Sequence, residues 1–150
     1  IETMAAWTGA RLEHAQCAQL CQMATDPLYF NLKMNSTMLA EDITFSVIYT
    51  SDATNHATDQ ELERIDMGPI KNGIFEFCIA AAAPLVQNVA PENLFDSTIF
   101  YICCIYKGQE FARIGWYVRH GYPEGTEIPP GGELQLDKLA RYVLLEIHVS

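Results

Sequence analysis

Apolar and polar residues alternate along most of the chain from Leu28 onward. A period of two is typical of half-buried β-strands, and turn-forming residues separate the alternating segments. The segments expected to form strands are residues 28–34, 43–49, 62–67, 74–79, 97–106 and 110–118. Roughly seven short strands joined by turns are characteristic of two packed antiparallel sheets. The pattern therefore predicts an all-β protein with a β-sandwich fold.

Two segments depart from this period. Apolar residues between Leu134 and Glu146 fall near helical spacing after the Pro-Pro-Gly-Gly sequence at 129–132, which predicts a short helix near the C-terminus. Residues 11–23 have a composition compatible with a helix but weak apolar periodicity, so a helix and an edge strand both remain possible. Since no repeat or linker interrupts the chain, we expect residues 1–150 to form a single domain.

Lys107-Gly108 joins the two longest alternating segments and predicts a β-hairpin. With Tyr106-Lys107-Gly108 as a three-residue loop, Gly108 takes the left-handed position and a G1 bulge follows. That loop length pairs odd-numbered residues of one strand with odd-numbered residues of the other. The hairpin then has one face of even-numbered residues and one face of odd-numbered residues.

The even-numbered face of the hairpin is uniformly apolar, and we expect it to lie in the core. It consists of Phe100, Ile102, Cys104, Ala112, Ile114, Trp116 and Val118. The odd-numbered face consists of Ser97, Ile99, Tyr101, Cys103, Arg113, Gly115 and Tyr117. A mixture of aliphatic, tyrosine and arginine side chains is typical of the centre of a protein interface. Half-exposed strands also carry Ile and Tyr through β-propensity alone, so both explanations stay open here.

The chain is acidic, with nine Lys and Arg against nineteen Asp and Glu and a formal net charge of −10. This balance disfavours direct binding to nucleic acid or to an anionic membrane, and it favours a basic partner or simple solubility. Seven acids fall within residues 41–66, a segment that has a single base, Arg64. They are Glu41, Asp42, Asp52, Asp59, Glu61, Glu63 and Asp66. Such a segment is either a solvated edge or the rim of a surface that binds a basic protein.

Cysteine and histidine residues do not form a recognisable metal motif. The chain has five cysteines, an odd number, and the adjacent Cys103 and Cys104 are poor partners for each other, so we expect free thiols in an intracellular, soluble protein. His14, Cys17 and Cys21 would share one face if their segment were helical. A fourth ligand and the paired spacing of a structural zinc site are lacking, so no metal is expected.

Catalytic motifs are also lacking. The sequence has no Gly-x-Ser-x-Gly elbow, no phosphate-binding loop and no His-Glu-x-x-His pair. We therefore expect no enzymatic activity and no cofactor.

Three motifs carry a resemblance to a known family. They are Asp59-Gln60-Glu61-Leu62, Met67-Gly68-Pro69-Ile70 and the continuous segment from Tyr106 to Val118, which includes Gly-Gln-Glu-Phe-Ala-Arg-Ile-Gly-Trp-Tyr-Val. These motifs resemble the core of the anti-silencing-function histone chaperones. Residues 26–30 and 41–49, Pro129-Pro130 and the segment Lys138-Leu139-x-Arg141 keep the same register. The resemblance covers roughly residues 26–144.

The resemblance implies an elongated immunoglobulin-like sandwich that binds the heterodimer of histones three and four. Such a chaperone blocks formation of the histone tetramer and hands histones to downstream chaperones during nucleosome assembly and disassembly. It implies a monomer in the nucleus, with no direct contact to nucleic acid or membrane. The alternative is an unrelated intracellular, acidic β-sandwich that serves as a protein-interaction module.

Carried over by position, the family's histone-binding residues become Ile99, its neighbours Ser97, Tyr101 and Tyr117, and the ionic residues Asp59 and Arg113. Glu41 and Asp42 match an acidic pair that receives basic motifs of downstream chaperones. The sequence departs from the family pattern at Asn93 and Thr44, where the family has acids. The family's last strand, which receives the tail of histone four, is expected beyond Ser150 or not at all.

Overall fold

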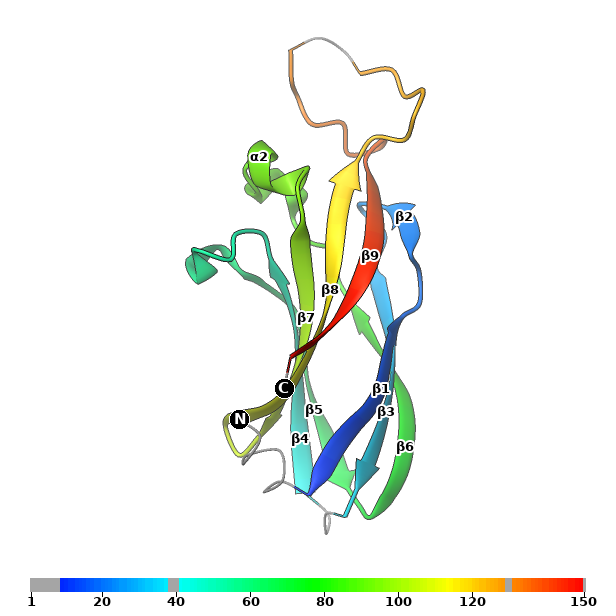
Figure 1. Cartoon of the computed structure of the whole chain (residues 1–150), viewed down its shortest axis with the longest axis vertical. Helices are drawn as coiled ribbons and strands as arrows, with labels where there is room; N and C mark the ends of the chain where they lie inside the picture. The colour runs from blue at the N-terminus through cyan, green and yellow to red at the C-terminus, as the bar shows by residue number, and fades with distance from the viewer. Residues whose placement is uncertain (1–8, 38–40, 129–130, 150) are drawn as a thin grey trace.

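Two antiparallel sheets pack face to face in the computed structural model, which describes residues 9–37, 41–128 and 131–149. A three-stranded sheet has the order β1-β3-β6, and a six-stranded sheet has the order β2-β9-β8-β7-β4-β5. The molecule is elongated along the strands (Figure 1). The strands are β1 (Ala10–Cys17), β2 (Cys21–Met23), β3 (Leu28–Ser36), β4 (Glu41–Thr50), β5 (Gln60–Ile70), β6 (Gly73–Ala81), β7 (Thr98–Tyr106), β8 (Gln109–Gly121) and β9 (Ala140–Val149). The predicted all-β sandwich is confirmed.

Aromatic side chains from both sheets fill the core. Phe30 of β3 packs against Trp116 of β8 with ring centroids 5.0 Å apart, and Phe45 of β4 lies 5.1 Å from Phe77 of β6. Alternation along β3 and β7 buries every second residue, as the sequence pattern requires for strands with one face on a core. The inward face of the β7–β8 hairpin is the predicted even-numbered face, with Ala112 half-buried and the other six side chains buried.

The helix predicted near the C-terminus is wrong. Residues 134–139 contain a single turn in which the amides of Lys138 and Leu139 both donate to the carbonyl of Gln135. The chain then continues as β9, which pairs with β8 over most of its length. Leu139, Arg141 and Val143 are buried, so this segment has a period of two once a charged residue is counted as inward-facing. Pro129-Pro130 lies outside the described residues.

The N-terminal segment that the sequence left open forms strands. β1 pairs with β3, and the short β2 pairs with Ala140–Tyr142 of β9. The described helices are all short: the single-turn α-helix α2 (Pro91–Leu94) and the 3-10 turns η1 (His56–Thr58) and η2 (Val86–Asn88). None of the helices in the described part of the chain has the length and apolar character that a membrane span requires.

The hairpin loop is shorter than predicted, although the predicted pairing is correct. Tyr106 pairs with Gln109, and Lys107 and Gly108 both have positive φ, 50° and 77°, which makes a two-residue turn. A bulge then adds one residue to β8 between Glu110 and Ala112. Beyond the bulge, residues of equal parity pair as expected, because one extra residue in the strand has the same effect on register as one extra residue in the loop.

Candidate functional site

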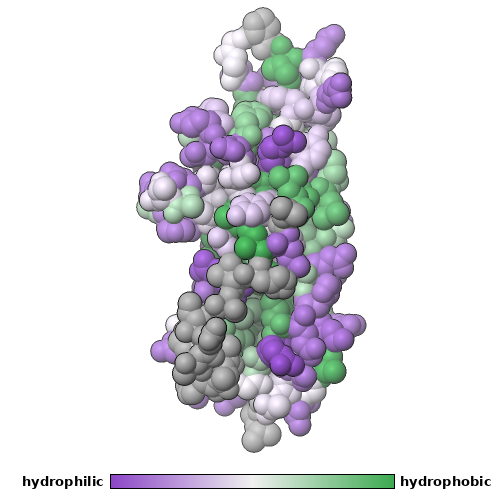
Figure 2. Space-filling view, in the orientation of Figure 1, coloured by the Kyte–Doolittle hydropathy of each residue, from purple (hydrophilic) through white to green (hydrophobic). Residues whose placement is uncertain are grey.

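The outward face of β4, β7 and β8 brings together the odd-numbered residues of the hairpin. Ile99 pairs with Thr50 on one side and Tyr117 on the other, Tyr101 with Ile48 and Gly115, and Cys103 with Ser46 and Arg113. Ile99, Tyr101 and Arg113 are half-buried, whereas Tyr117 is 38% exposed. Figure 2 shows apolar surface where β8 and β9 run, bordered by hydrophilic side chains. The predicted mixed face is thus assembled as one surface.

Close packing at Gly115 fixes the ring of Tyr101. A Cβ atom added to Gly115 would lie 2.9 Å from Cδ1 of Tyr101 and 3.1 Å from the carbonyl oxygen of Phe100. Only glycine at this position leaves room for the tyrosine ring where it now lies. The ring is therefore held against the sheet beside Ile99.

Arg113 is held at one end of this surface. Its Nη2 donates to Oε1 of Glu110 at 2.8 Å and its Nε donates to Oε2 at 3.1 Å, while the guanidinium carbon lies 4.7 Å from the Tyr101 ring centroid. Burial opposes the charge, but the carboxylate of Glu110, with Cys103 and Tyr101, outweighs it and raises the pKa of Arg113. Cys103 beneath it is buried, which raises the pKa of its thiol to about 12 and keeps it protonated.

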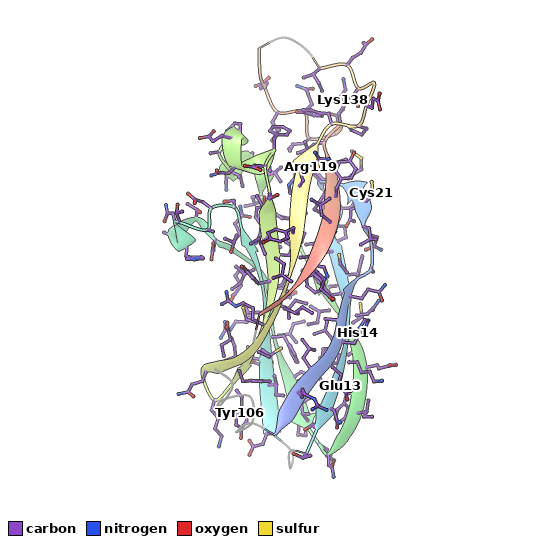
Figure 3. All side chains as sticks on the ribbon, in the orientation of Figure 1. Glu13, His14, Cys21, Tyr106, Arg119 and Lys138 are labelled. Atoms are coloured by element: carbon purple, nitrogen blue, oxygen red, sulfur yellow. The ribbon has the colours of Figure 1, made fainter. Side chains whose placement is uncertain are left out.

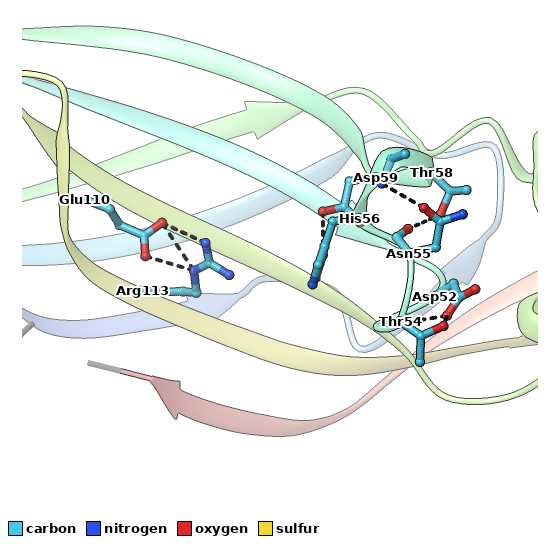
Figure 4. A network of polar contacts seen from close by, with 9 residues as sticks. Asp52, Thr54, Asn55, His56, Thr58, Asp59, Glu110 and Arg113 are labelled. Carbon is cyan, nitrogen blue, oxygen red and sulfur yellow. Dashed lines mark hydrogen bonds and ion pairs between the residues drawn. The ribbon is translucent and has the colours of Figure 1, made fainter.

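Asp59 lies at the opposite end of the same surface. Because Gln60 pairs with Tyr49, the residue before it falls in the row of Thr50 and Ile99. Its Oδ2 lies 3.1 Å from Nδ1 of His56, and its Oδ1 is buried without a hydrogen-bond partner in the described part of the chain (Figure 4). The Asp59 side chain is 23% exposed. The negatively charged Asp59 therefore borders this surface at the end opposite to Arg113.

The two ionic residues do not contact each other. Across the paired strands, Asp59 is level with Ile99 of β7, and Arg113 is level with Cys103 of β7. These two positions on β7 are four residues apart. Four residues of a strand span about 13 Å. Figure 4 accordingly shows two separate networks, one around Glu110 and Arg113 and one in the loop that carries Asp59. Ser97, the remaining predicted residue, is exposed directly before β7, and its amide donates to Oδ1 of Asp96.

Glu41 and Asp42 form a different site at the hairpin end of the molecule. They line a pocket of ≈ 420 Å³ together with Thr44, Asp66, Tyr106, Lys107 and Gly108. Asp66 was named from the sequence only as one of seven acids and was not grouped with Glu41 and Asp42, because only the pairing of β4 with β5 brings it opposite Thr44. The Thr44 hydroxyl donates to Oδ1 of Asp66 at 2.6 Å, which places an acid beside the position where Thr44 departs from the family pattern.

The suggested metal geometry at His14, Cys17 and Cys21 does not exist, because the segment is not helical. His14 and Cys17 lie on β1, where His14 is exposed and Cys17 is buried. Cys21 is on β2, far along the molecule from His14 (Figure 3). Among the described residues, no group of three or more His, Cys, Asp or Glu side chains is arranged to hold a metal ion.

Comparisons with known proteins agree with the resemblance in the sequence. A sequence model of the family described as ASF1 like histone chaperone matches residues 11–148, which extends the similarity beyond residues 26–144 in both directions. "Histone chaperone asf1" of Drosophila melanogaster is 37% identical over 108 residues, covering 71% of this chain and 49% of the fly protein. "Histone chaperone ASF1" of Saccharomyces cerevisiae is 31% identical over 125 residues, covering 81% of this chain and 44% of the yeast protein. The Mycosarcoma maydis protein of the same name is 32% identical over 123 residues, covering 80% of this chain and 70% of that protein. The chain thus spans about half the length of the fly and yeast relatives.

Proposed function

Because the chain belongs to the family of ASF1-like histone chaperones, we propose that it binds the heterodimer of histones three and four through the face centred on Ile99. The observation that carries this proposal is the arrangement of that face. A half-buried aliphatic residue and two tyrosines lie between an acid and a base of opposite charge, Asp59 and Arg113. Apolar anchors surrounded by polar and charged groups are characteristic of specific protein interfaces.

The proposed mechanism is competition for one histone surface. Ile99 and the tyrosines bury the surface through which two histone heterodimers would otherwise associate, so the tetramer cannot form on the chaperone. Asp59 pairs with a basic side chain and Arg113 with an acidic one, and their separation along β7 sets the register of the complex. The remaining negative charge of the chain accelerates encounter with basic histones and disfavours nucleic acid.

We assign hand-over to downstream chaperones to the acidic pocket of Glu41, Asp42 and Asp66. A basic peptide from such a chaperone would pair with these carboxylates, and Asp66 would compensate for the threonine at position 44. The pocket is at the hairpin end, so a peptide there leaves the Ile99 face open. The protein would act in nucleosome assembly and disassembly, in the nucleus.

The edge of β9 suggests where the tail of histone four could add as a strand. β2 pairs with Ala140–Tyr142, and the amide of Val143 donates to the carbonyl of Leu20 at 2.9 Å. Beyond Val143, no strand in the described part of the chain pairs with that edge. An extended peptide can bind such an edge through main-chain hydrogen bonds. We therefore propose β9 as the acceptor, in place of the expectation that it lies beyond Ser150 or is absent.

Binding of the purified histone heterodimer by wild type and by Ile99→Arg tests the proposal. A buried, unpaired charge at the centre of an interface costs about 2 kcal/mol or more, so we expect the affinity to fall at least roughly thirtyfold. Ile74→Arg is the matched control, because Ile74 is 61% exposed on β6 of the other sheet. Equal affinity of Ile99→Arg and wild type would refute the assignment of this face.

The alternative is an unrelated acidic interaction module that attracts basic proteins without specificity. Titration with lysozyme beside the histone heterodimer, at physiological ionic strength, separates the two functions. A specific chaperone prefers the histones strongly and loses that preference in Ile99→Arg. Comparable affinity for both proteins would support the nonspecific alternative.

A further inference from the structure

His56 and Asp59 form a contact that belongs to the proposed histone face but involves a residue without an assigned role. Nδ1 of His56 lies 3.1 Å from Oδ2 of Asp59, and the His56 side chain is 65% exposed against 23% for Asp59. The backbone fixes the two residues, because the amide of Asp59 donates to the carbonyl of His56 at 3.1 Å. Asn55 caps the η1 turn by accepting from the amide of Ala57. The imidazole of His56 is thus held beside the carboxylate of Asp59.

The protonation state of His56 changes what this end of the face offers to a basic partner. A neutral imidazole with its proton on Nδ1 donates to Oδ2 and orients the carboxylate, which keeps its full negative charge. A protonated imidazole makes the same hydrogen bond but cancels that charge and presents a second, positive N–H at the surface. A lysine or arginine that approaches Asp59 then meets a cation beside its target.

The other charged groups around His56 are already engaged or more distant. Asp52 accepts from the amide and the hydroxyl of Thr54, which lowers its pKa, with a smaller contribution from His56. In the same sheet, Arg64 of β5 pairs with Glu61 at 3.2 Å, and Arg113 of β8, at the opposite end of the face, pairs with Glu110 at 2.8 Å. Of the side-chain types named here, histidine is the one whose charge ordinarily changes close to neutral pH.

We propose that His56 is a positioning residue for Asp59 that makes histone binding weaken as the pH falls from 7.5 to 6.0. This inference rests on the proposed function and adds a regulatory property to the same face. Neutral His56 holds the acid in its binding geometry, and protonated His56 competes with the histone cation for it. Histone binding and proton binding at this end of the face are therefore mutually antagonistic.

The test compares histone affinity at pH 7.5 and 6.0, at constant ionic strength, for wild type, His56→Gln and Asp59→Asn. Because proton binding by His56 and histone binding are antagonistic, we expect the affinity of wild type to fall measurably over this range. His56→Gln keeps an N–H donor for Asp59 but cannot titrate, so we expect it to lose most of the pH response, whatever its affinity at pH 7.5. Asp59→Asn should bind more weakly at pH 7.5 and also lose the response.

Each outcome separates the two proposals. The histidines of the histones contribute equally in all three titrations, so only the difference between variants is attributed to His56. The same pH response in wild type and His56→Gln would overturn the inference while leaving histone binding in place. A full response in Asp59→Asn would overturn the role of the acid. No histone binding by wild type at pH 7.5 would instead refute the proposed function itself.

Discussion

The guanidinium of Arg113 lies 4.7 Å from the ring centroid of Tyr101, and its Nε and Nη2 donate to the carboxylate of Glu110. Both partners are present before any ligand binds, so the arginine is pre-organised on the proposed histone face. Its fixed position avoids part of the side-chain ordering cost that an unrestrained arginine would incur on binding.

Arg113→Lys should therefore weaken histone binding although it keeps the charge. Lysine cannot form the two-pronged hydrogen bonds to Glu110 and stacks less well on Tyr101. We expect a cost of about 1–2 kcal/mol, roughly tenfold in the dissociation constant measured by calorimetry. Arg64→Lys is the control, since Arg64 forms a similar i, i+3 pair with Glu61 on edge strand β5. Unchanged affinity in Arg113→Lys would mean that the charge, and not the geometry of the guanidinium, is what matters. Equal losses in both variants would mean that the effect is not specific to Arg113.

Gly115→Ala tests whether the position of the Tyr101 ring matters. The new methyl group would lie 2.9 Å from Cδ1 of Tyr101, so the ring must move off the strand. We expect a loss of stability of about 1–3 kcal/mol in urea unfolding and a reduced affinity for histones. Gly121→Ala at the end of the same strand is the control, because nothing lies within 4 Å of its added Cβ. Unchanged stability and binding in Gly115→Ala would show that the ring position is not critical.

The hairpin face was predictable from sequence because it depends only on parity. Ile99 and Tyr117 face the same way whether the extra residue is in the loop, as predicted, or in the bulge between Glu110 and Ala112, as observed. The placement of Asp59 was not predictable in this way. It depends on which residue of β4 pairs with Gln60 and on the pairing of β4 with β7, two long-range registers that local patterns do not encode.

The C-terminal strand was missed because its pattern includes a buried charge. Arg141 is fully buried on β9, where its Nη1 and Nη2 donate to the carbonyls of Ala24 and Asp26. A sequence pattern assigns arginine to the surface, which hides the period of two and favours a helix. The carbonyl partners lie more than a hundred residues away in the chain, so only the folded structure reveals them.

His120 should make the protein lose stability in mild acid. Burial lowers the pKa of this histidine from 6.5 to about 4, and neither ring nitrogen has a hydrogen-bond partner in the described part of the chain. Below pH 6.5 the unfolded chain takes up a proton that the folded state excludes. The free energy of unfolding should therefore decrease as the pH falls from 6.5 to 4, by about 3 kcal/mol in all.

Urea unfolding of wild type and His120→Phe between pH 7 and pH 4.5 measures this contribution. Phenylalanine keeps a ring against Tyr49, whose centroid is 6.0 Å from that of His120, and cannot titrate. We expect the variant to be at least as stable as wild type at pH 7 and to show a weaker pH dependence. Parallel pH profiles for the two proteins would place the acid sensitivity at other groups.

The separation of the two proposed binding surfaces yields a prediction about charge reversal. Glu41→Lys with Asp42→Lys changes the acidic pocket at the hairpin end, which is lined by neither Ile99 nor Tyr117. We expect binding of basic chaperone peptides to fall by two orders of magnitude or more, because two attractive pairs become repulsive. Histone affinity should change only by the small, salt-dependent effect of four units of charge on encounter.

Fluorescence anisotropy with a labelled basic peptide and calorimetry with the histone heterodimer measure the two activities on the same variant. Glu124→Lys with Glu127→Lys makes the same change in net charge on exposed residues of the loop after β8 and controls for it. If the control weakened both activities as strongly as the pocket variant, overall charge would explain the loss. If only the pocket variant lost both activities, histones and chaperone peptides would share one acidic surface, and Asp59 would have to act together with Glu41 and Asp42 despite lying at the other end of β4 and β5.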